Sequence, residues 1–140
     1  MNEYLISEAA EKSGVNKETI RYYESMKLIK VPKRNVSGYR LYSEVVVERI
    51  KFIKRAQALG FTLKEIIELL SLENHPTQNS MPVRMLTLKK LEEVELKIAH
   101  LQDLQKALKH LSGSCNGKTD VAHCPIIQSL AGAAVQKNRG

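Results

Sequence analysis

The chain has 140 residues, no tryptophan, an aromatic content of 5% and a formal net charge of +7 at pH 7. This length allows one domain, or a small domain with a long extension, and the few aromatic residues argue against a single large globular core. No paired carboxylates, phosphate-binding loop or Ser/His/Asp grouping is present, which argues against an enzyme. No signal peptide, membrane-spanning run or lipidation motif is present either, so we expect a cytoplasmic protein without a membrane partner.

The positive charge is concentrated in the first half of the chain. Residues 1–64 carry 13 Lys and Arg against 7 Asp and Glu, whereas residues 65–140 carry 9 against 8. A basic half attracts nucleic-acid phosphates or an anionic membrane surface, and a solvated charged surface is the alternative interpretation.

Residues 4–24 have the spacing of a helix-turn-helix. Residues 4–13 predict a short amphipathic helix capped by Ser7, and Asn16 caps a second helix over residues 17–24. Ile20 belongs to the core, and the other faces of the second helix present cations and hydroxyl groups that can reach phosphates and base edges. The DNA-binding candidates on this helix are Lys17, Thr19, Arg21, Tyr22 and Tyr23.

Residues 28–42 alternate short apolar stretches around a Ser37–Gly38 turn, which predicts a two-stranded wing. Arg34, Tyr39 and Arg40 lie on this wing, and their charges and hydroxyl suit contacts with the DNA backbone. Tyr42 and Tyr22 have an alternative interpretation as half-buried core residues with the hydroxyl group at the surface.

Two further helices follow the wing. Ser43 begins the third helix, which Gly60 ends, and the capping box from Thr62 to Glu65 begins the fourth. The apolar residues of both helices are core, and Arg55 of the third helix is a further DNA-binding candidate. Residues 73–81 are a polar connector.

Apolar residues recur at steps of three and four between residues 82 and 112, which predicts a coiled-coil seam. An exposed helix with this stripe would leave a large apolar patch in water, so we expect a homodimer, with packing against the chain's own first half as the alternative. Two winged helix-turn-helix units related by a twofold axis would contact the half-sites of a palindrome. The stripe contains Leu88, Leu91, Val94, Ile98, Leu101, Leu104, Leu108 and Leu111.

Cys115 and Cys124 bracket eight residues and are the chain's two cysteines. Paired thiolates favour soft metal ions such as Cu(I). Because Pro125 suits the first position of a helix, Cys124 is expected at a helix N-terminus, where free N–H groups lower its pKa. The alternatives are a disulfide across the loop, or two small buried apolar side chains.

Four segments together resemble the MerR family of metal-responsive transcription regulators, and the resemblance covers essentially the whole chain. It implies a mainly α fold: a winged helix-turn-helix, a connector, a dimerisation helix in an antiparallel coiled coil, and a metal-binding loop with a short helix and tail. It also implies a dimer on promoter DNA that activates by distorting the DNA and acts on RNA polymerase indirectly. The segments are residues 14–24, 38–42, 50–66 and 124–127. The four regions are residues 1–72, 73–81, 82–112 and 113–140.

The resemblance is nearest to the copper-efflux branch of the family. Divalent sensors of the family place a further Cys near the start of the dimerisation helix, where it joins the partner chain's loop, and Ser80 stands there in this chain. Two thiolates and a monovalent ion give a site of net charge −1, which a helix N-terminus and a nearby cation can balance. Arg84 matches a position that is basic in the copper branch, with an exposed helix charge as its alternative. We therefore expect Cu(I), or Ag(I) and Au(I) as mimics, to be the effector.

Two alternatives stay open at this point. The eight-residue loop has the length of the mercury-type sensors, so a divalent ion could bind with His123, His75 or water as further ligands. A thiol redox sensor, in which the two cysteines form a disulfide, belongs to a different functional class.

Overall fold

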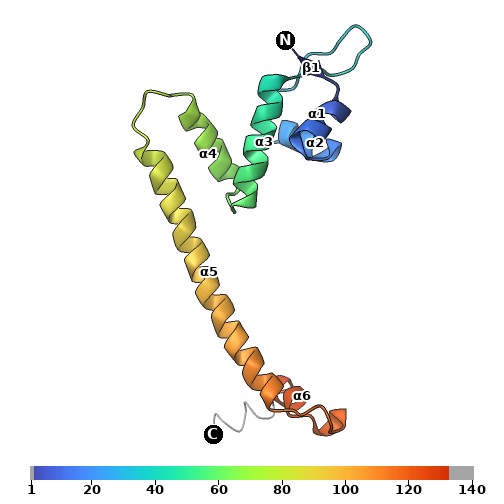
Figure 1. Cartoon of the computed structure of the whole chain (residues 1–140), viewed down its shortest axis with the longest axis vertical. Helices are drawn as coiled ribbons and strands as arrows, with labels where there is room; N and C mark the ends of the chain where they lie inside the picture. The colour runs from blue at the N-terminus through green and yellow to red at the C-terminus, as the bar shows by residue number, and fades with distance from the viewer. Residues whose placement is uncertain (1, 133–140) are drawn as a thin grey trace. The chain divides into compact units, whose positions relative to one another are not determined.

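The computed structural model describes residues 2–132, and the end of the predicted tail lies outside them. The chain divides into two units, residues 1–90 and 91–140. In chain order the elements are β1 (Glu3–Tyr4), α1 (Ile6–Ser13), α2 (Lys17–Ser25), β2 (Tyr42–Ser43), α3 (Glu44–Ala58), α4 (Leu63–Glu73), α5 (Met81–Gly113), the 3-10 helix η1 (Val121–His123) and α6 (Pro125–Leu130) (Figure 1). The predicted, mainly helical fold is confirmed. Within residues 2–132, no helix combines the length and apolarity that a membrane crossing requires.

The core of the first unit is built on α3. Val47, Ile50 and Ile53 recur every three residues along this helix, and all three side chains are fully buried. Helices α1 and α4 and strand β2 all pack against α3. Complete burial of an aliphatic side chain of this size contributes about 1.5–3 kcal/mol, so this one helical face supplies much of the stability of the unit.

The starts of α3 and α4 confirm the predicted caps. The Ser43 hydroxyl accepts a hydrogen bond from the Val46 backbone at 3.3 Å. At the start of α4, the Thr62 hydroxyl accepts from the Glu65 backbone at 3.2 Å, and the Glu65 carboxylate accepts from the Thr62 backbone at 2.8 Å. Both helices therefore begin where short-range sequence signals place them.

The start of α1 differs from the prediction. Leu5, rather than Ser7, occupies the N-cap position, and Ser7 lies inside the helix. The backbone N–H of Leu5 donates to the Glu8 carboxylate at 3.0 Å, so an acidic residue in the first turn secures the helix start. Tyr4, which was predicted to be helical, belongs to β1.

The wing is present, but its base differs from the predicted hairpin. Arg34 and Arg40 form a single antiparallel bridge near the tip. The Asn35 side chain accepts from the backbones of Ser37 and Tyr39 at 3.0 Å each, which holds the turn. Below the tip, residues 28–33 form no strand, and Leu28 and Ile29 are buried in the core. Instead, β2 pairs with β1 at the start of the chain.

The turn between α1 and α2 is attached to α3. Gly14 ends α1 with a φ of +75°, a conformation that favours glycine. The Lys54 ammonium group donates to the Gly14 carbonyl at 2.7 Å. A Cβ atom at position 14 would lie only 2.7 Å from that ammonium nitrogen. Glycine therefore provides both the turn and the space that Lys54 occupies.

The first part of α5 is joined to α4 by a shielded ion pair. The Lys90 ammonium group lies 2.9 Å from the Glu65 carboxylate, and both side chains are less than 15% exposed. Lys90 also lies over the Phe61 ring, 5.8 Å from its centroid. Hydrogen bonds from the Thr62 backbone and from Lys90 lower the pKa of Glu65 to about 2.

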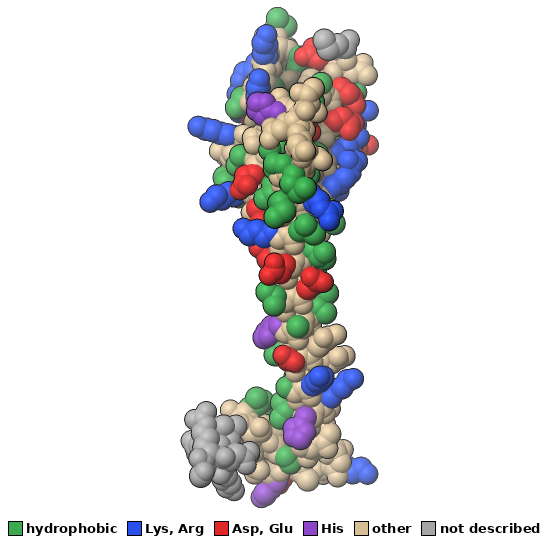
Figure 2. Space-filling view, turned by 90° about the vertical axis from the view of Figure 1, so that its left-hand side faces the viewer, with side chains coloured by type: hydrophobic (Ala, Val, Ile, Leu, Met, Phe, Trp, Pro, Cys, Tyr) green, Lys and Arg blue, Asp and Glu red, His purple; other side chains and the backbone are tan. Residues whose placement is uncertain are grey.

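The predicted apolar stripe of α5 is exposed within the described chain. Its side chains from Leu88 to Leu108 are between 38% and 64% exposed, and Figure 2 shows hydrophobic side chains at the surface along this helix. No α5 residue is classed as buried. A helix of 33 residues with this surface requires a covering partner in water.

We expect Glu65→Gln to lower the free energy of unfolding by about 1–2 kcal/mol at pH 7, because it weakens the cap of α4 and removes the charge opposite Lys90. The pKa of Glu65 lies below its ordinary 4.5, so its contribution is complete above about pH 4.5 and is lost as the pH falls toward 2. In urea unfolding, the difference in free energy of unfolding between the wild-type protein and the variant should be smaller at pH 3 than at pH 7. The matched control is Glu68→Gln, an exposed carboxylate on the same helix. An equal loss of stability at both pH values would contradict the stabilising role of the ionised Glu65 carboxylate.

Candidate functional site

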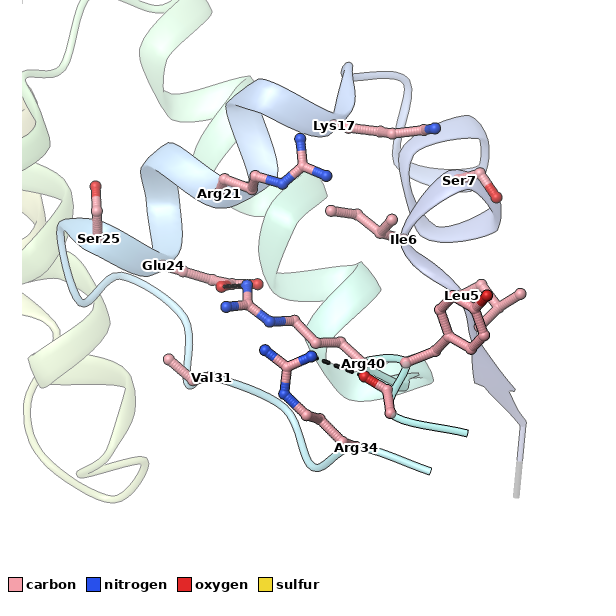
Figure 3. A pocket seen from close by; sticks show the side chains of 12 residues that line it. Leu5, Ile6, Ser7, Lys17, Arg21, Glu24, Ser25, Val31, Arg34 and Arg40 are labelled. Carbon is pink, nitrogen blue, oxygen red and sulfur yellow. Dashed lines mark hydrogen bonds and ion pairs between the residues drawn. The ribbon is translucent and has the colours of Figure 1, made fainter. Parts of the chain in front are cut away.

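A hollow on the first unit lies between α2, the start of α1 and the wing. Figure 3 shows cationic side chains from both α2 and the wing pointing into it. Lys17 and Arg21 lie four residues apart on α2 and therefore share one face of that helix. The predicted DNA-binding residues that line the hollow are Lys17, Arg21, Arg34, Tyr39 and Arg40. The structure thus brings together two groups of cations that are far apart in the sequence.

The cations of this hollow differ in how closely other groups of the protein hold them. The Arg21 side chain is more than half exposed, and its ion pair with Glu18 is long, at 3.8 Å. Arg34 instead donates to the Gly38 carbonyl at 2.7 Å, so its guanidinium group is held against the wing turn. A polyanion such as the DNA backbone could therefore contact an exposed, weakly paired cation on α2 and a hydrogen-bonded cation on the wing.

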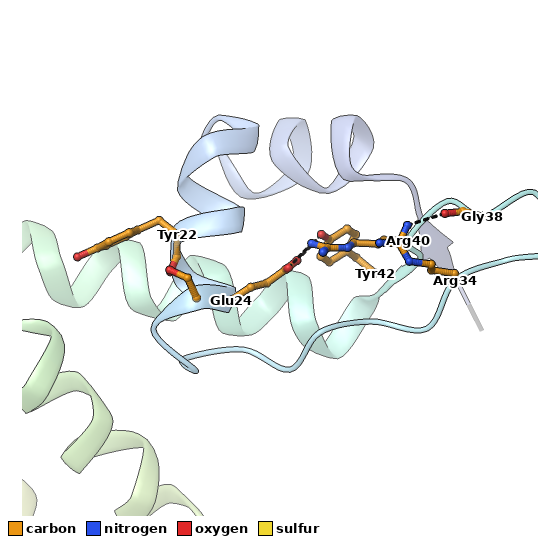
Figure 4. Close-up of polar contacts among 7 residues, drawn as sticks. Tyr22, Glu24, Arg34, Gly38, Arg40 and Tyr42 are labelled. Atoms are coloured by element: carbon orange, nitrogen blue, oxygen red, sulfur yellow. Dashed lines mark hydrogen bonds and ion pairs between the residues drawn. The ribbon is translucent and has the colours of Figure 1, made fainter.

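Arg40 is held by an acidic residue that the sequence analysis did not single out. Its guanidinium group donates to the Glu24 carboxylate, which also accepts a hydrogen bond from the Tyr42 hydroxyl. Burial, together with the hydrogen bond to Glu24, raises the pKa of Tyr42 to about 12, so this hydroxyl group stays a donor. Figure 4 shows Glu24 pointing from α2 toward Arg40, whereas Tyr22 points away. The available signal was an acidic residue at the end of the helix that was predicted to bind DNA.

The prediction that Tyr23 contacts DNA is wrong. The side chain is 2% exposed, and its hydroxyl group donates to the Gln57 side chain on α3 at 2.6 Å. Tyr23 follows Ile20 by three residues, so both side chains lie on the buried face of α2. Burial raises the pKa of Tyr23. Tyr22 lies on the exposed face instead.

Two other predicted DNA contacts, Thr19 and Arg55, do not line this hollow. The Thr19 hydroxyl donates to Asn16 at 2.7 Å and thus belongs to the cap of α2. Arg55 is exposed on α3, where it borders a shallow depression with Lys12, Lys51 and Lys54. It does not line the hollow between α2 and the wing, so it belongs to a second basic surface.

The second unit brings the two cysteines together. Their sulfur atoms lie 3.6 Å apart, both residues are partly exposed, and neither is in a disulfide. The Gly117 backbone N–H points at the Cys115 sulfur at 3.4 Å. Eight intervening residues therefore form a loop that brings the two thiols together, as a metal site of paired thiolates requires.

Cys124 occupies the N-cap position of α6, and Pro125 is the first residue of that helix, as predicted. Hydrogen bonding from the Ile127 backbone, with smaller contributions from Cys115 and the Ile126 backbone, lowers the pKa of Cys124. A thiolate binds soft metal ions more strongly than a thiol, so this position suits a metal ligand.

The histidine nearest to the thiols has another partner. The His123 ring lies 2.5 Å from the Asp120 carboxylate, whose oxygen also accepts from the His123 backbone at 3.1 Å. In residues 2–132, no group of three or more His, Cys, Asp or Glu side chains is placed to hold a metal ion. His75, Ser80 and Arg84 all lie in the first unit, where Ser80 is exposed just before α5. The described chain therefore offers two thiols as its metal donors.

Comparisons with known proteins agree with this arrangement. The family of MerR helix-turn-helix regulatory proteins matches residues 4–73, and the MerR DNA-binding family matches residues 47–111. The chain belongs to the MerR family. MerR regulators are transcription regulators, not enzymes, and they bind promoter DNA as dimers.

Three relatives illustrate the range of the family. The mercuric resistance operon regulatory protein of Bacillus cereus is 43% identical over 91% of this chain and 96% of its own. The regulator CueR of Salmonella typhimurium is 38% identical over 94% of this chain and 95% of its own. The lead(II) complex of PbrR691 from Ralstonia metallidurans is 35% identical, with a TM-score of 0.80 over 91% of this chain and 98% of its own.

We expect Tyr23→Phe to lower the free energy of unfolding by about 1 kcal/mol while DNA affinity stays unchanged, because the hydroxyl group bonds Gln57 inside the unit. Thermal unfolding and fluorescence anisotropy with labelled duplex DNA measure the two effects. Tyr22→Phe is the matched variant on the exposed face, and it should leave stability unchanged. A loss of DNA affinity in Tyr23→Phe without a loss of stability would restore Tyr23 as a DNA contact.

Proposed function

We propose that this MerR-family protein is a metal-responsive transcription regulator whose effector is a monovalent soft ion, Cu(I), with Ag(I) and Au(I) as mimics. The observation that carries the proposal is the number of donors: two thiols lie together, without a third donor of their own unit among the described residues. Two thiolates suffice for a monovalent soft ion, whereas Zn²⁺ in proteins takes four ligands.

The charge of the site supports a monovalent ion. Two thiolates with one monovalent cation leave a net charge of −1, and the free N–H groups at the start of α6 offset it. Hydrogen bonding from the Ile127 backbone lowers the pKa of Cys124, so its thiolate forms more readily than that of an ordinary cysteine. We infer that Ser80 of the partner chain approaches this site, as the family resemblance implies, and that a hydroxyl group there contributes no third thiolate.

The distance between the two sulfur atoms supports a divalent ion as the second candidate effector. With metal–sulfur bonds of about 2.3 Å, two sulfurs lie about 3.8 Å apart on a tetrahedral ion and about 4.6 Å apart on a linear one. The separation of 3.6 Å therefore fits a bent arrangement, and a linear ion requires the sulfurs to move apart by about 1 Å. The relative from Bacillus cereus is named for mercuric resistance.

For DNA binding, we propose that α2 and the wing of each protomer contact one half-site of a palindromic promoter. The cations in the hollow support this role, since they come from two elements and face one side. The exposed stripe of α5 supports a homodimer held by an antiparallel coiled coil. Binding of the effector then activates a metal-efflux or detoxification promoter by distorting the DNA.

We expect Cys115→Ser and Cys124→Ser each to abolish metal binding and promoter induction while DNA affinity survives, since the thiols lie in the second unit. Titration of the reduced protein under a competing Cu(I) chelator, with Zn(II) and Hg(II) in parallel, measures metal preference. Tight binding of one Cu(I) with weak Zn(II) binding is the expected result. Thr119→Ala, an exposed change in the same loop, is the control. Tight binding of Hg(II) or Zn(II) with weak Cu(I) would favour the divalent candidate.

We expect Ser80→Cys to extend the response toward divalent ions, because it adds a third thiolate at the position where divalent sensors of the family have one. A promoter reporter exposed to copper, zinc, cadmium and mercury salts measures this. Thr77→Cys, which adds a thiol three residues earlier in the connector, controls for an extra thiol as such. If Ser80→Cys left metal preference unchanged, Ser80 would not be a selectivity determinant.

We expect Arg21→Ala to weaken binding to all duplexes and to lower the slope of log affinity against log salt by about one, because a single phosphate contact is lost. Lys106→Ala, on the exposed surface of α5, is the control and should change neither quantity. Anisotropy titrations between 50 and 200 mM salt, about the range over which phosphate contacts dominate, provide the slopes. An unchanged slope would remove Arg21 from the phosphate contacts.

A further inference from the structure

Glu24 is a buried acidic residue at the edge of a surface that otherwise attracts anions. Its side chain is 5% exposed and lines the same hollow as Lys17, Arg21 and Arg34. A carboxylate in this place opposes phosphate binding by its charge. Figure 3 shows it reaching from the last turn of α2 into the cluster of guanidinium groups. Its presence therefore requires a reason other than direct contact with DNA.

Both donors to Glu24 come from the wing. One carboxylate oxygen accepts from the Arg40 guanidinium group, and the other accepts from the Tyr42 hydroxyl group. Tyr42 is fully buried, so no water replaces this acceptor. A buried carboxylate with two donors holds them firmly, because leaving any of the three groups unpaired carries a large desolvation penalty.

Arg40 also connects Glu24 with the tip of the wing. It forms the antiparallel bridge with Arg34, and Arg34 donates to the Gly38 carbonyl of the turn. Contacts therefore run from α2 through Glu24 and Arg40, and by the backbone bridge to Arg34, to the wing turn. Figure 4 shows the first and the last of these contacts, between Glu24 and Arg40 and between Arg34 and Gly38. Below the tip, residues 30–33 form no strand, and a backbone hydrogen bond from Leu41 to the Lys33 carbonyl at 3.0 Å joins the two arms of the wing to each other rather than to α2.

We propose that Glu24 is a positioning residue for DNA recognition, which acts through Arg40 to fix the wing against α2. With the wing fixed, the cations of α2 and of the wing meet one duplex at one spacing. This inference rests on the proposed DNA-binding role of α2 and the wing. Such positioning favours a duplex of the correct sequence and shape, whereas nonspecific binding tolerates a range of wing positions.

The competing explanation is simple charge screening, in which Glu24 only reduces the repulsion among Arg21, Arg34 and Arg40. Screening predicts that removal of the negative charge raises affinity for every duplex. Positioning predicts a loss of affinity that is confined to the specific duplex. The two explanations therefore predict changes of opposite sign in the affinity for the specific duplex.

Glu24→Gln tests the proposal, because the amide keeps the shape of the side chain and one acceptor oxygen. The full-length protein is titrated by anisotropy against a duplex that the wild-type protein selects from a random pool, and against a scrambled duplex. We expect about a tenfold loss on the selected duplex and less than about a twofold change on the scrambled one. Glu18→Gln is the matched control, since it removes the same charge from an exposed position on the same helix.

A double-mutant cycle separates positioning through Arg40 from a general structural effect. In an Arg40→Gln background, Glu24→Gln should cause no further loss of specific affinity, because the contact is already absent. Additive losses, equal losses on both duplexes, or higher affinity on both would each overturn the proposal.

If Glu24→Gln fails to fold, Tyr42→Phe is the second variant, because it removes only one of the two donors to Glu24. Tyr42→Phe should show about a threefold loss of affinity that is confined to the selected duplex. A threefold loss on both duplexes would overturn the proposal. If the wild-type protein selects no duplex, the proposed DNA-binding role fails instead.

Discussion

The DNA-binding half of the chain depends on the buried face of α3. Val47, Ile50 and Ile53 are fully buried there, and α1, α4 and β2 all pack on this helix. Tyr23 of α2 reaches α3 through Gln57, and Lys54 reaches the turn before α2. The recognition helix is thus held from both ends by the same helix. Because the inward face of α2 packs in the core, its outward face, with Lys17 and Arg21, is exposed and can contact DNA.

Short-range signals in the sequence predicted the helices well. The Ser43 cap, the Thr62–Glu65 capping box and the Pro125 start each depend on residues within one helical turn, and all three are confirmed. Helix α5 spans Met81–Gly113, within one residue at each end of the range 82–112 in which the sequence predicts a long helix from its apolar period. Local chemistry decides these features, so a single sequence contains enough information to place them.

Some errors arise where distant segments meet, whereas the cap of α1 and the position of Tyr23 were misread from local spacing. The pairing of β1 with β2 joins Tyr4 to Tyr42, and no local pattern shows such a pair. Tyr23 was assigned to DNA although its spacing from Ile20 already places it on the inward face. The role of Glu24 depends on partners 16 and 18 residues away. For the metal site, the thiols and the helix start were predictable, whereas the separation of the sulfur atoms required coordinates.

The contact between Lys54 and Gly14 has a consequence for how this chain can vary in sequence. Any side chain at position 14 would displace the Lys54 ammonium group as well as strain the turn. The Lys54 ammonium group already borders the basic surface of α3 with Lys51 and Arg55, and it would shift its position there. A substitution at this glycine therefore redistributes charge on another helix, and variation at positions 14 and 54 should be correlated among descendants of this sequence.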